Sequence, residues 1–422
     1  MQDRARTHEL RRLSQAEADA ICARHERLWK ARPGGARAVF AWCDLSGLSF
    51  KGRNLADADF SASVMHGTDL SGCKLDNANF FGADMQEADL SEASLRRTDL
   101  RGACLKGADL SGADLFEADL REGTLAASDR DAGFRLIKPV ERASDASGVS
   151  LVGANLERSR MAGVVAVRAD FTDAIMRDCK LVRANLKQAT LNGADLAGSD
   201  LSGADLSGAD LTDAVLVGVK SESWRTDGAN LAGALTDDRS SQPAVAPLVA
   251  AERLGAHARW CETDGAEGSP SIFDGLDLRT LTSVRGFNLT ALSARGAIFY
   301  GLDMEGVKLQ GAHLEGADLR SCNLKGADLR GARLAGARLN GSDLREAHLG
   351  PLLLGTDRLL PCDLTGSVLR GADLSGADLR HAVLAQADLR RARLLGAQTR
   401  QADFAFARLD GAVGGETIRD TA

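Results

Sequence analysis

The sequence predicts an all-β solenoid, because an apolar residue returns at every fifth position along most of the 422 residues. Clean copies of the unit read Ala-Asp-Leu-Ser-Gly, as at 108–112 and 204–208. A period of five fits neither an α-helix nor a flat strand, whose periods are about 3.6 and 2 residues. It requires a chain that turns a corner every few residues, so that each coil adds its own portion of core.

Each position of the unit has an expected role. The central residue, such as Leu206, is predicted to point into the bore of the solenoid. The residue two positions earlier is small, because the bore leaves little room there. The glycine two positions after the centre can adopt the positive φ of a type II corner. Five of the eight cysteines take the small inward position: Cys43, Cys73, Cys179, Cys322 and Cys362.

The phase of the repeat divides the chain into three runs, from Leu45 to Leu125, from Leu151 to Leu216 and from about Val284 to Leu409. The step of 26 residues from Leu125 to Leu151 is not a multiple of five. We therefore expect residues 126–148 to leave the coil as a loop or short hairpin. The third run keeps its phase across 350–361, where Leu354 and Leu359 are predicted to be further central residues.

Two helices are predicted outside the repeats. In the first, Ser14 and Glu17 form a capping-box signature and Pro33 follows the helix end. Its buried face is expected to hold Ile21, His25, Leu28 and Trp29. In the second, Pro247 is suited to the first helical position. Its buried stripe is expected to hold Leu248, Ala251, Leu254 and Ala258.

These elements indicate two tandem modules, each headed by a helix that caps exposed coil edges or, alternatively, binds a partner. The predicted segments are a helical header at 1–42, a first solenoid at 43–220, a linker at 221–246, a second header at 247–275, a second solenoid at 276–411 and a flexible tail at 412–422.

The repeats resemble the pentapeptide-repeat family over most of residues 43–411. Runs of consecutive Ala-Asp/Asn-Leu-x-Gly units carry this resemblance. It implies a right-handed quadrilateral β-helix, with four pentapeptides in each coil and one on each wall.

Composition argues against several functional classes. The net charge of −7 does not suit a general nucleic-acid binder. No segment approaches the roughly 20 apolar residues of a membrane helix, and Met1 to Leu13 lacks a secretory apolar core. The seven histidines do not recur at metal-binding spacing, and no HExxH, GxSxG or Walker motif is present. We expect a cytoplasmic protein that is not an enzyme, with no cofactor or metal and no direct nucleic-acid or membrane partner.

Outward residues spaced by 20 should stack into ladders. The acidic ladders are Asp69, Asp89 and Asp109; Asn79, Asp99 and Asp119; and Asp303, Asn323, Asp343 and Asp363. These aspartates can build turns by accepting backbone hydrogen bonds, or they can imitate the phosphates of DNA. A candidate basic wall holds Arg330, Arg370 and Arg390, with Gly350 in the gap, and Lys325 and Arg345 should share another wall.

The preferred functional hypothesis is a protein–protein interaction scaffold whose partner is unidentified. The alternative is a DNA-mimicking modulator of a type II topoisomerase, since the resemblance implies that some family members bind gyrase. Its acidic face would belong to the first module, because most of the net negative charge falls within residues 1–245. The polar tail at 412–422 and the arginine-bearing walls depart from that group. A third hypothesis is an effector delivered into a host cell.

Overall fold

The computed structural model describes residues 10–125, 140–237, 243, 245–355 and 358–414. The chain forms two compact units, Met1–Asp237 and Asp238–Ala422, each with its own buried cluster of apolar side chains. None of the described helices is long and apolar enough to cross a lipid bilayer.

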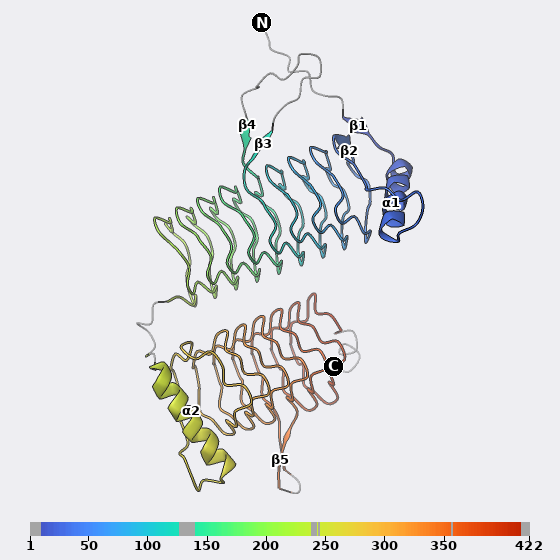
Figure 1. Cartoon of the computed structure of the whole chain (residues 1–422). Coiled ribbons are helices and arrows are strands. Elements are labelled where there is room, and N and C mark those ends of the chain that lie inside the picture. The colour runs from blue at the N-terminus through green and yellow to red at the C-terminus, as the bar shows by residue number, and fades with distance from the viewer. Residues whose placement is uncertain (1–9, 126–139, 238–242, 244, 356–357, 415–422) are drawn as a thin grey trace. The chain divides into compact units, whose positions relative to one another are not determined.

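Both units are stacks of short coils (Figure 1). Parallel β-bridges join residues that are 20 positions apart, such as Asp69 with Asp89 and Asp89 with Asp109. Turns separate the bridges every five residues, so one coil consists of four pentapeptides. In the first unit the bridges extend from Val39 to Leu235, and in the second from Ile272 to Val413. The five-residue phase therefore identified the coil correctly.

The central residues fill the bore, as predicted. Leu206 is 0% exposed, and the rings of Phe40, Phe60 and Phe80, in three successive coils, stack on one another. The ring centroids of Phe40 and Phe60 are 5.0 Å apart, and those of Phe60 and Phe80 are 4.8 Å apart. This spacing matches the roughly 4.8 Å separation of hydrogen-bonded strands, so each coil places its side chain on the one before it.

Several polar side chains at the small inward position bond the backbone, whereas the buried Ser367 hydroxyl has no partner among the described residues. The Cys73 thiol donates to the Phe50 carbonyl at 2.9 Å, and the Thr68 hydroxyl donates to the Leu45 carbonyl at 3.0 Å. Burial raises the pKa of the Cys73 thiol to about 11. Cys179, Cys322 and Cys362 are buried at the same position, whereas Cys43 is only half-buried. These thiols are packed as small, unreactive side chains.

The first coil stack is interrupted by a hairpin whose strands are β3 (Gly123–Leu125) and β4 (Val140–Arg142), paired antiparallel. The predicted excursion is confirmed at its base, while residues 126–139 lie outside the described residues. Its boundaries were wrong. Cys104 pairs with Asp145, 41 positions later, so 21 extra residues separate the buried centres Leu120 and Ala146. Leu125 follows Leu120 by five residues and so matches the repeat in sequence, but it belongs to strand β3 of the hairpin.

A second hairpin, formed by β5 (Leu352–Leu354) and β6 (Arg358–Leu360), leaves the coil of the second unit. The prediction that Leu354 and Leu359 are central residues is wrong, because they are 41% and 50% exposed. Arg333 pairs with Asp363, 30 positions later, which leaves ten residues outside the coil. Ten residues equal two repeats, so the phase of the sequence does not reveal the insertion.

The first helix, α1 (Gln15–Trp29), has the predicted capping box. The Ser14 backbone donates to Glu17 Oε2 at 2.8 Å, and this bond and the Ser14 hydroxyl lower the pKa of Glu17 to about 2. The predicted face was partly wrong. The buried residues are Ala18, Cys22 and His25. Leu28 and Trp29 are 48% and 51% exposed. A short strand before the helix, β1 (Arg11–Arg12), pairs in parallel with β2 (Cys43–Asp44).

The second helix, α2 (Pro247–Glu262), begins at the predicted proline. Its buried residues are Ala250, Leu254 and His257. Of the predicted stripe only Leu254 is buried, and Leu248 is 74% exposed. The apolar pattern of this helix placed the buried face incorrectly: the buried residues Ala250, Leu254 and His257 follow i, i+4, i+7 spacing, and Leu248 lies outside that face.

Two predicted boundaries require correction. The first solenoid continues to Leu235, which forms a parallel β-bridge with Val215. The linker therefore does not begin at residue 221. Ser221 and Thr226 occupy central positions of this last coil, and their polarity disguised it as a linker. The second solenoid begins at Ile272, which pairs with Ser293 at a separation of 21 residues. One extra residue in the first coil explains why the phase became clear only near Val284.

Candidate interaction surfaces

One wall of the first unit is acidic along most of its length. Asp69, Asp89 and Asp109 stack in the predicted register, and the bridges then continue through Ser150, Asp170, Thr190 and Asp210. We call the five aspartates of this wall the acidic face: Asp69, Asp89, Asp109, Asp170 and Asp210. Lys51 is the one basic residue at the outward and corner positions of this wall in the described part of the unit. None of the five carboxylates forms an ion pair with a described lysine or arginine.

Each carboxylate of the acidic face also builds its own turn. The backbone N–H groups of Ser71, Ser91 and Ser111 donate to the Oδ1 atoms of the aspartates two positions earlier, at 2.9 to 3.0 Å. Burial alone would raise the pKa of Asp69, but the bonds from Ser71 and Ser49 outweigh it and lower that pKa. The structure thus supports the turn-building role of Oδ1. The second oxygen, Oδ2, of Asp89 and of Asp109 accepts no hydrogen bond from the described chain.

Substitutions at Asp109 should separate its turn-building role from its charge. Asp109→Ala should lower the free energy of unfolding by about 1 kcal/mol, because the Ser111 N–H loses its acceptor. Asp109→Asn keeps an acceptor oxygen and removes one charge from a stacked row, so stability should be unchanged or slightly higher. Urea unfolding at low and at high salt measures both. Equal destabilisation by alanine and asparagine would show that the charge itself stabilises the coil.

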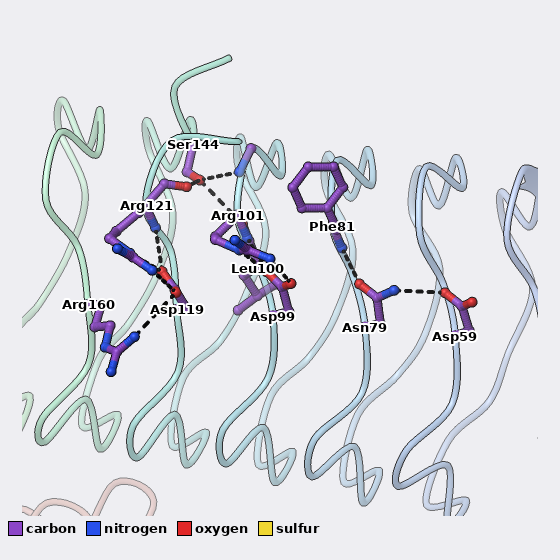
Figure 2. A network of polar contacts seen from close by, with 11 residues as sticks. Asp59, Asn79, Phe81, Asp99, Leu100, Arg101, Asp119, Arg121, Ser144 and Arg160 are labelled. Atoms are coloured by element: carbon purple, nitrogen blue, oxygen red, sulfur yellow. Dashed lines mark hydrogen bonds and ion pairs between the residues drawn. The ribbon is translucent and has the colours of Figure 1, made fainter. Parts of the chain in front are cut away.

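A second predicted ladder is neutralised by arginine (Figure 2). Asn79, Asp99 and Asp119 stack as predicted. Arg101 binds both oxygens of Asp99 at 2.9 and 2.7 Å, and Arg121 binds Asp119 at the same two distances. Although burial tends to raise it, the pKa of Asp119 is lowered by these arginine contacts. This wall therefore does not present a continuous strip of negative charge.

Two features decide whether an aspartate is neutralised: the residue after the central leucine, and the basic residues on adjacent coils, such as Lys187 and Arg225 beside Asp205. In Asp-Leu-Arg units the guanidinium reaches back over two positions and clamps the carboxylate, as at 99–101. In Asp-Leu-Ser units the serine is too short to neutralise it, as at 89–91. This tripeptide distinction was visible in the sequence. It would have excluded the second ladder, whereas the acidic face also depends on the absence of basic residues on adjacent coils of the described wall.

The predicted basic wall is wrong, because the hairpin of β5 and β6 shifts the stacking. Arg370 and Arg390 share a wall and both contact Asp388 at 2.7 Å. Arg330 instead clamps Asp328 on a different wall, where Asp328 stacks on His348 and His348 on Asp378. The last step of the third acidic ladder fails for the same reason. Asp303, Asn323 and Asp343 stack, but Asp343 continues to Asp373, and Asp363 stacks on Arg333. Lys325 and Arg345 do follow paired residues of one wall.

The two helix histidines have equivalent structural roles. His25 Nδ1 accepts the Ala38 N–H at 3.0 Å, and His257 Nδ1 accepts the Ser271 N–H at the same distance. Each of these backbone groups begins the first coil of its unit. His257 Nε2 lies 3.0 Å from the Thr290 carbonyl, and His25 bonds the backbone of Ala56. Both rings are 1% exposed.

This arrangement fixes the tautomer. Because Nδ1 accepts, the neutral ring carries its proton on Nε2. The Trp29 indole N–H, 3.2 Å from Nε2 of His25, therefore packs against the ring and is not hydrogen-bonded to it. Burial is the main cause that lowers the pKa of both histidines. Within the described ranges, no group of three His, Cys, Asp or Glu residues could hold a metal ion.

Comparison with known proteins agrees with the coil geometry. The model of the family described as pentapeptide repeats matches eight copies, which together cover more than half of the chain. The matched residues are 38–77, 78–115, 142–178, 179–218, 312–350, 362–396 and 381–413. No curated protein sequence matches the chain.

Several solved structures are similar. The pentapeptide repeat protein Rfr23 from the cyanobacterium Cyanothece 51142 is 23% identical over 33% of this chain and 91% of its own, with a TM-score of 0.24. HetL from Nostoc sp. strain PCC 7120, involved in heterocyst differentiation regulation, is 22% identical over 92% and 94%, with a TM-score of 0.14. QnrB1, a plasmid-mediated fluoroquinolone resistance protein, is 22% identical over 52% and 92%, with a TM-score of 0.22. With its coils of four five-residue units and the matched family model, this chain belongs to the pentapeptide-repeat family, whose members form right-handed β-helices.

Proposed function

We propose that the protein is a non-enzymatic interaction scaffold whose acidic face engages a basic surface of a partner protein. The observation that carries this proposal is the stack of unpaired carboxylates on one wall of the first unit. Two carboxylates about 5 Å apart in water repel by roughly 1 kcal/mol before screening. A basic partner relieves this repulsion, and the field of the whole face accelerates encounter with it.

The scaffold is proposed to consist of two tandem modules, each a helix followed by a coil stack. Support comes from the two separate apolar cores and from the matching bonds of His25 and His257 to the first coil of each unit. A first coil exposes bore-facing side chains and unpaired backbone groups, which a helix can cover. We assign α1 and α2 this capping role.

Capture from extracts of the native organism, with the full-length protein as bait, tests the scaffold proposal. The triple variant Asp89→Asn, Asp109→Asn and Asp170→Asn removes three charges and keeps the turn acceptors. A matched control, Val64→Lys, Val165→Lys and Asn185→Lys, changes the net charge equally at outward positions of a neighbouring wall. We expect a partner that is lost with the asparagine variant and kept with the control. A partner retained by both variants, or none enriched at low salt, contradicts the proposal.

A second candidate is a DNA-mimicking modulator of a type II topoisomerase. It is favoured by one observation, that the acidic face continues on both sides of the first hairpin, from Asp69 to Asp210. Ser150 and Thr190 interrupt the row. A gyrase supercoiling assay tests it: the wild-type protein should inhibit supercoiling, and the triple asparagine variant should not. No effect at micromolar protein eliminates this candidate.

A further inference from the structure

The hairpin of β5 and β6 creates a concave site on an otherwise regular wall of the second unit. A cavity of about 550 Å³ lies where the chain leaves the coil at Gly350. We call it the hairpin notch. Its lining includes Arg330, His348, Leu359, Arg380 and His381.

The notch exists because one coil contributes no side chain there. Successive coils of this wall place Arg330, Gly350 and Arg380 after their central residues. A Cβ atom at Gly350 would lie 3.2 Å from Oδ2 of Asp378, so a side chain here would press against that carboxylate. Two guanidinium groups therefore flank a gap two coils wide, roughly 9.6 Å by strand spacing.

The two aspartates of the notch already accept hydrogen bonds from other residues of the chain. Asp328 accepts Arg330 Nε at 2.9 Å, Arg330 Nη2 at 2.7 Å and Gln310 Nε2 at 2.7 Å. Asp378 accepts Arg380 Nε at 2.9 Å and Arg380 Nη2 at 2.8 Å. The carboxylates of the notch are thus engaged by residues of the chain itself.

The donors of the notch are not occupied. Nη1 of Arg330, Nη1 of Arg380 and the rings of His348 and His381 make no hydrogen bond to any described residue. Each neutral imidazole offers one donor and one acceptor nitrogen, so it is the two guanidinium Nη1 groups that make the site favour a ligand with acceptors. Carboxylates are the strongest such acceptors, through charge-assisted bonds to guanidinium.

The hairpin adds an apolar surface beside these donors. Leu352 and Leu360 are cross-strand partners that lie over Gly331, where a Cβ would be 2.7 Å from Leu352 Cβ. Leu353 and Leu359 form the adjacent cross-strand pair, so they face the opposite side of the hairpin. They are 58% and 50% exposed, and Leu359 lines the notch.

We propose that the hairpin notch binds an extended acidic peptide segment of a partner protein, with two carboxylates and a neighbouring apolar residue. Alternate side chains of an extended peptide are about 6.8 Å apart, a span that two long arginine side chains flanking the gap can meet. The apolar residue packs on Leu353 and Leu359. This proposal goes beyond the scaffold function, since it assigns a binding site to the second unit. Its ligand is acidic, whereas the partner proposed for the acidic face is basic.

A fluorescein-labelled peptide with the sequence Gly-Glu-Gly-Glu-Gly-Leu-Gly, whose glutamates and leucine share one face when it is extended, is titrated with the full-length protein and tests the proposal by anisotropy. It should bind at least about tenfold more tightly than the peptide with glutamine for both glutamates, and more tightly than the peptide with serine for leucine. Arg380→Gln should weaken binding about tenfold or more. Leu353→Ser, at an exposed position that cannot disturb the core, should weaken it as well.

Arg345→Gln is the matched control. Arg345 clamps Asp343 with the same bidentate geometry, at 2.9 and 2.5 Å, on a wall without a hairpin. Peptide affinity should be unchanged in this variant and in the triple asparagine variant of the acidic face, whatever the outcome of the capture experiment. The proposal is overturned by equal binding of the glutamate and glutamine peptides, by equal weakening in Arg345→Gln, or by displacement with acetate at the same carboxylate concentration.

Discussion

Leu206→Asp is expected to unfold the coils around it. The Leu206 side chain is 0% exposed and belongs to the apolar cluster of the first unit. A carboxylate there has no partner within the bore, which costs several kcal/mol whether it stays charged or takes up a proton. Each coil is stabilised only by its neighbours, so the damage spreads to adjacent coils before it is contained.

The adjacent position provides the control. Ser207 lies on the outer wall one residue later, where its hydroxyl bonds Asp205 at 2.6 Å. Ser207→Asp introduces the same charge into solvent and should shift the midpoint of urea unfolding far less. Far-UV circular dichroism across a urea series measures both variants. A wild-type midpoint for Leu206→Asp would contradict the inward position of the central residues.

Acidification through the ordinary histidine range is expected to lower the melting temperature. The pKa values of His25 and His257 are lowered in the folded protein by burial, relative to an ordinary value of about 6.5. The unfolded chain therefore binds protons first as the pH falls. Stability is complete above about pH 6.5 and declines below it until the folded-state pKa values are passed. Protonation would also place a hydrogen on Nδ1, which could then no longer accept the hydrogen bonds from the backbone N–H groups of Ala38 and Ser271.

The double variant His25→Asn and His257→Asn should remove much of this pH dependence. The amide oxygen of asparagine can accept the same backbone hydrogen bond and does not titrate. The measurement is the difference in melting temperature between pH 7.5 and pH 5.5. His381→Asn, at a partly exposed position with φ of 57° that asparagine tolerates, is the control and should behave as the wild type. An undiminished difference in the double variant would assign the pH dependence to other groups.

The periodicity predicted the coil and its inward residues but not the number of coils. The phase of a five-residue repeat does not change when an insertion is a multiple of five residues long. The first hairpin adds 21 residues and changes the phase, so it was found. The second adds ten and does not, so Leu354 and Leu359 were placed in the bore and Arg330 on the wrong wall. Leu354 and Leu359 are five residues apart in a hairpin, which is the same spacing as two central residues of the coil. Nothing in their immediate sequence distinguishes the two structures.

The helix faces and the surface charges show a different limit of the sequence. Hydrophobicity placed Leu28 and Trp29 inward together with His25, and the structure buries only His25 of these three, where it accepts the Ala38 N–H. That bond forms only when the helix meets the coil. The stacking of aspartates was predictable from their spacing, but their neutralisation depends on the residue two positions later and on the neighbouring coils. Asp99 is clamped by the arginine of its own unit, whereas Asp205, in an Asp-Leu-Ser unit, pairs with Lys187 and Arg225 of the coils on either side.

The hairpin of β5 and β6 leaves one corner of the coil and returns to the same corner, and the bridges on either side remain in register. A protein built in this way can acquire a new loop by insertion without rebuilding its interior. The number of residues in the loop can vary, provided that the two ends of the loop are as far apart as the two ends of the turn that it replaces. Binding specificity can therefore diversify at the corners while the rod that carries them is inherited unchanged.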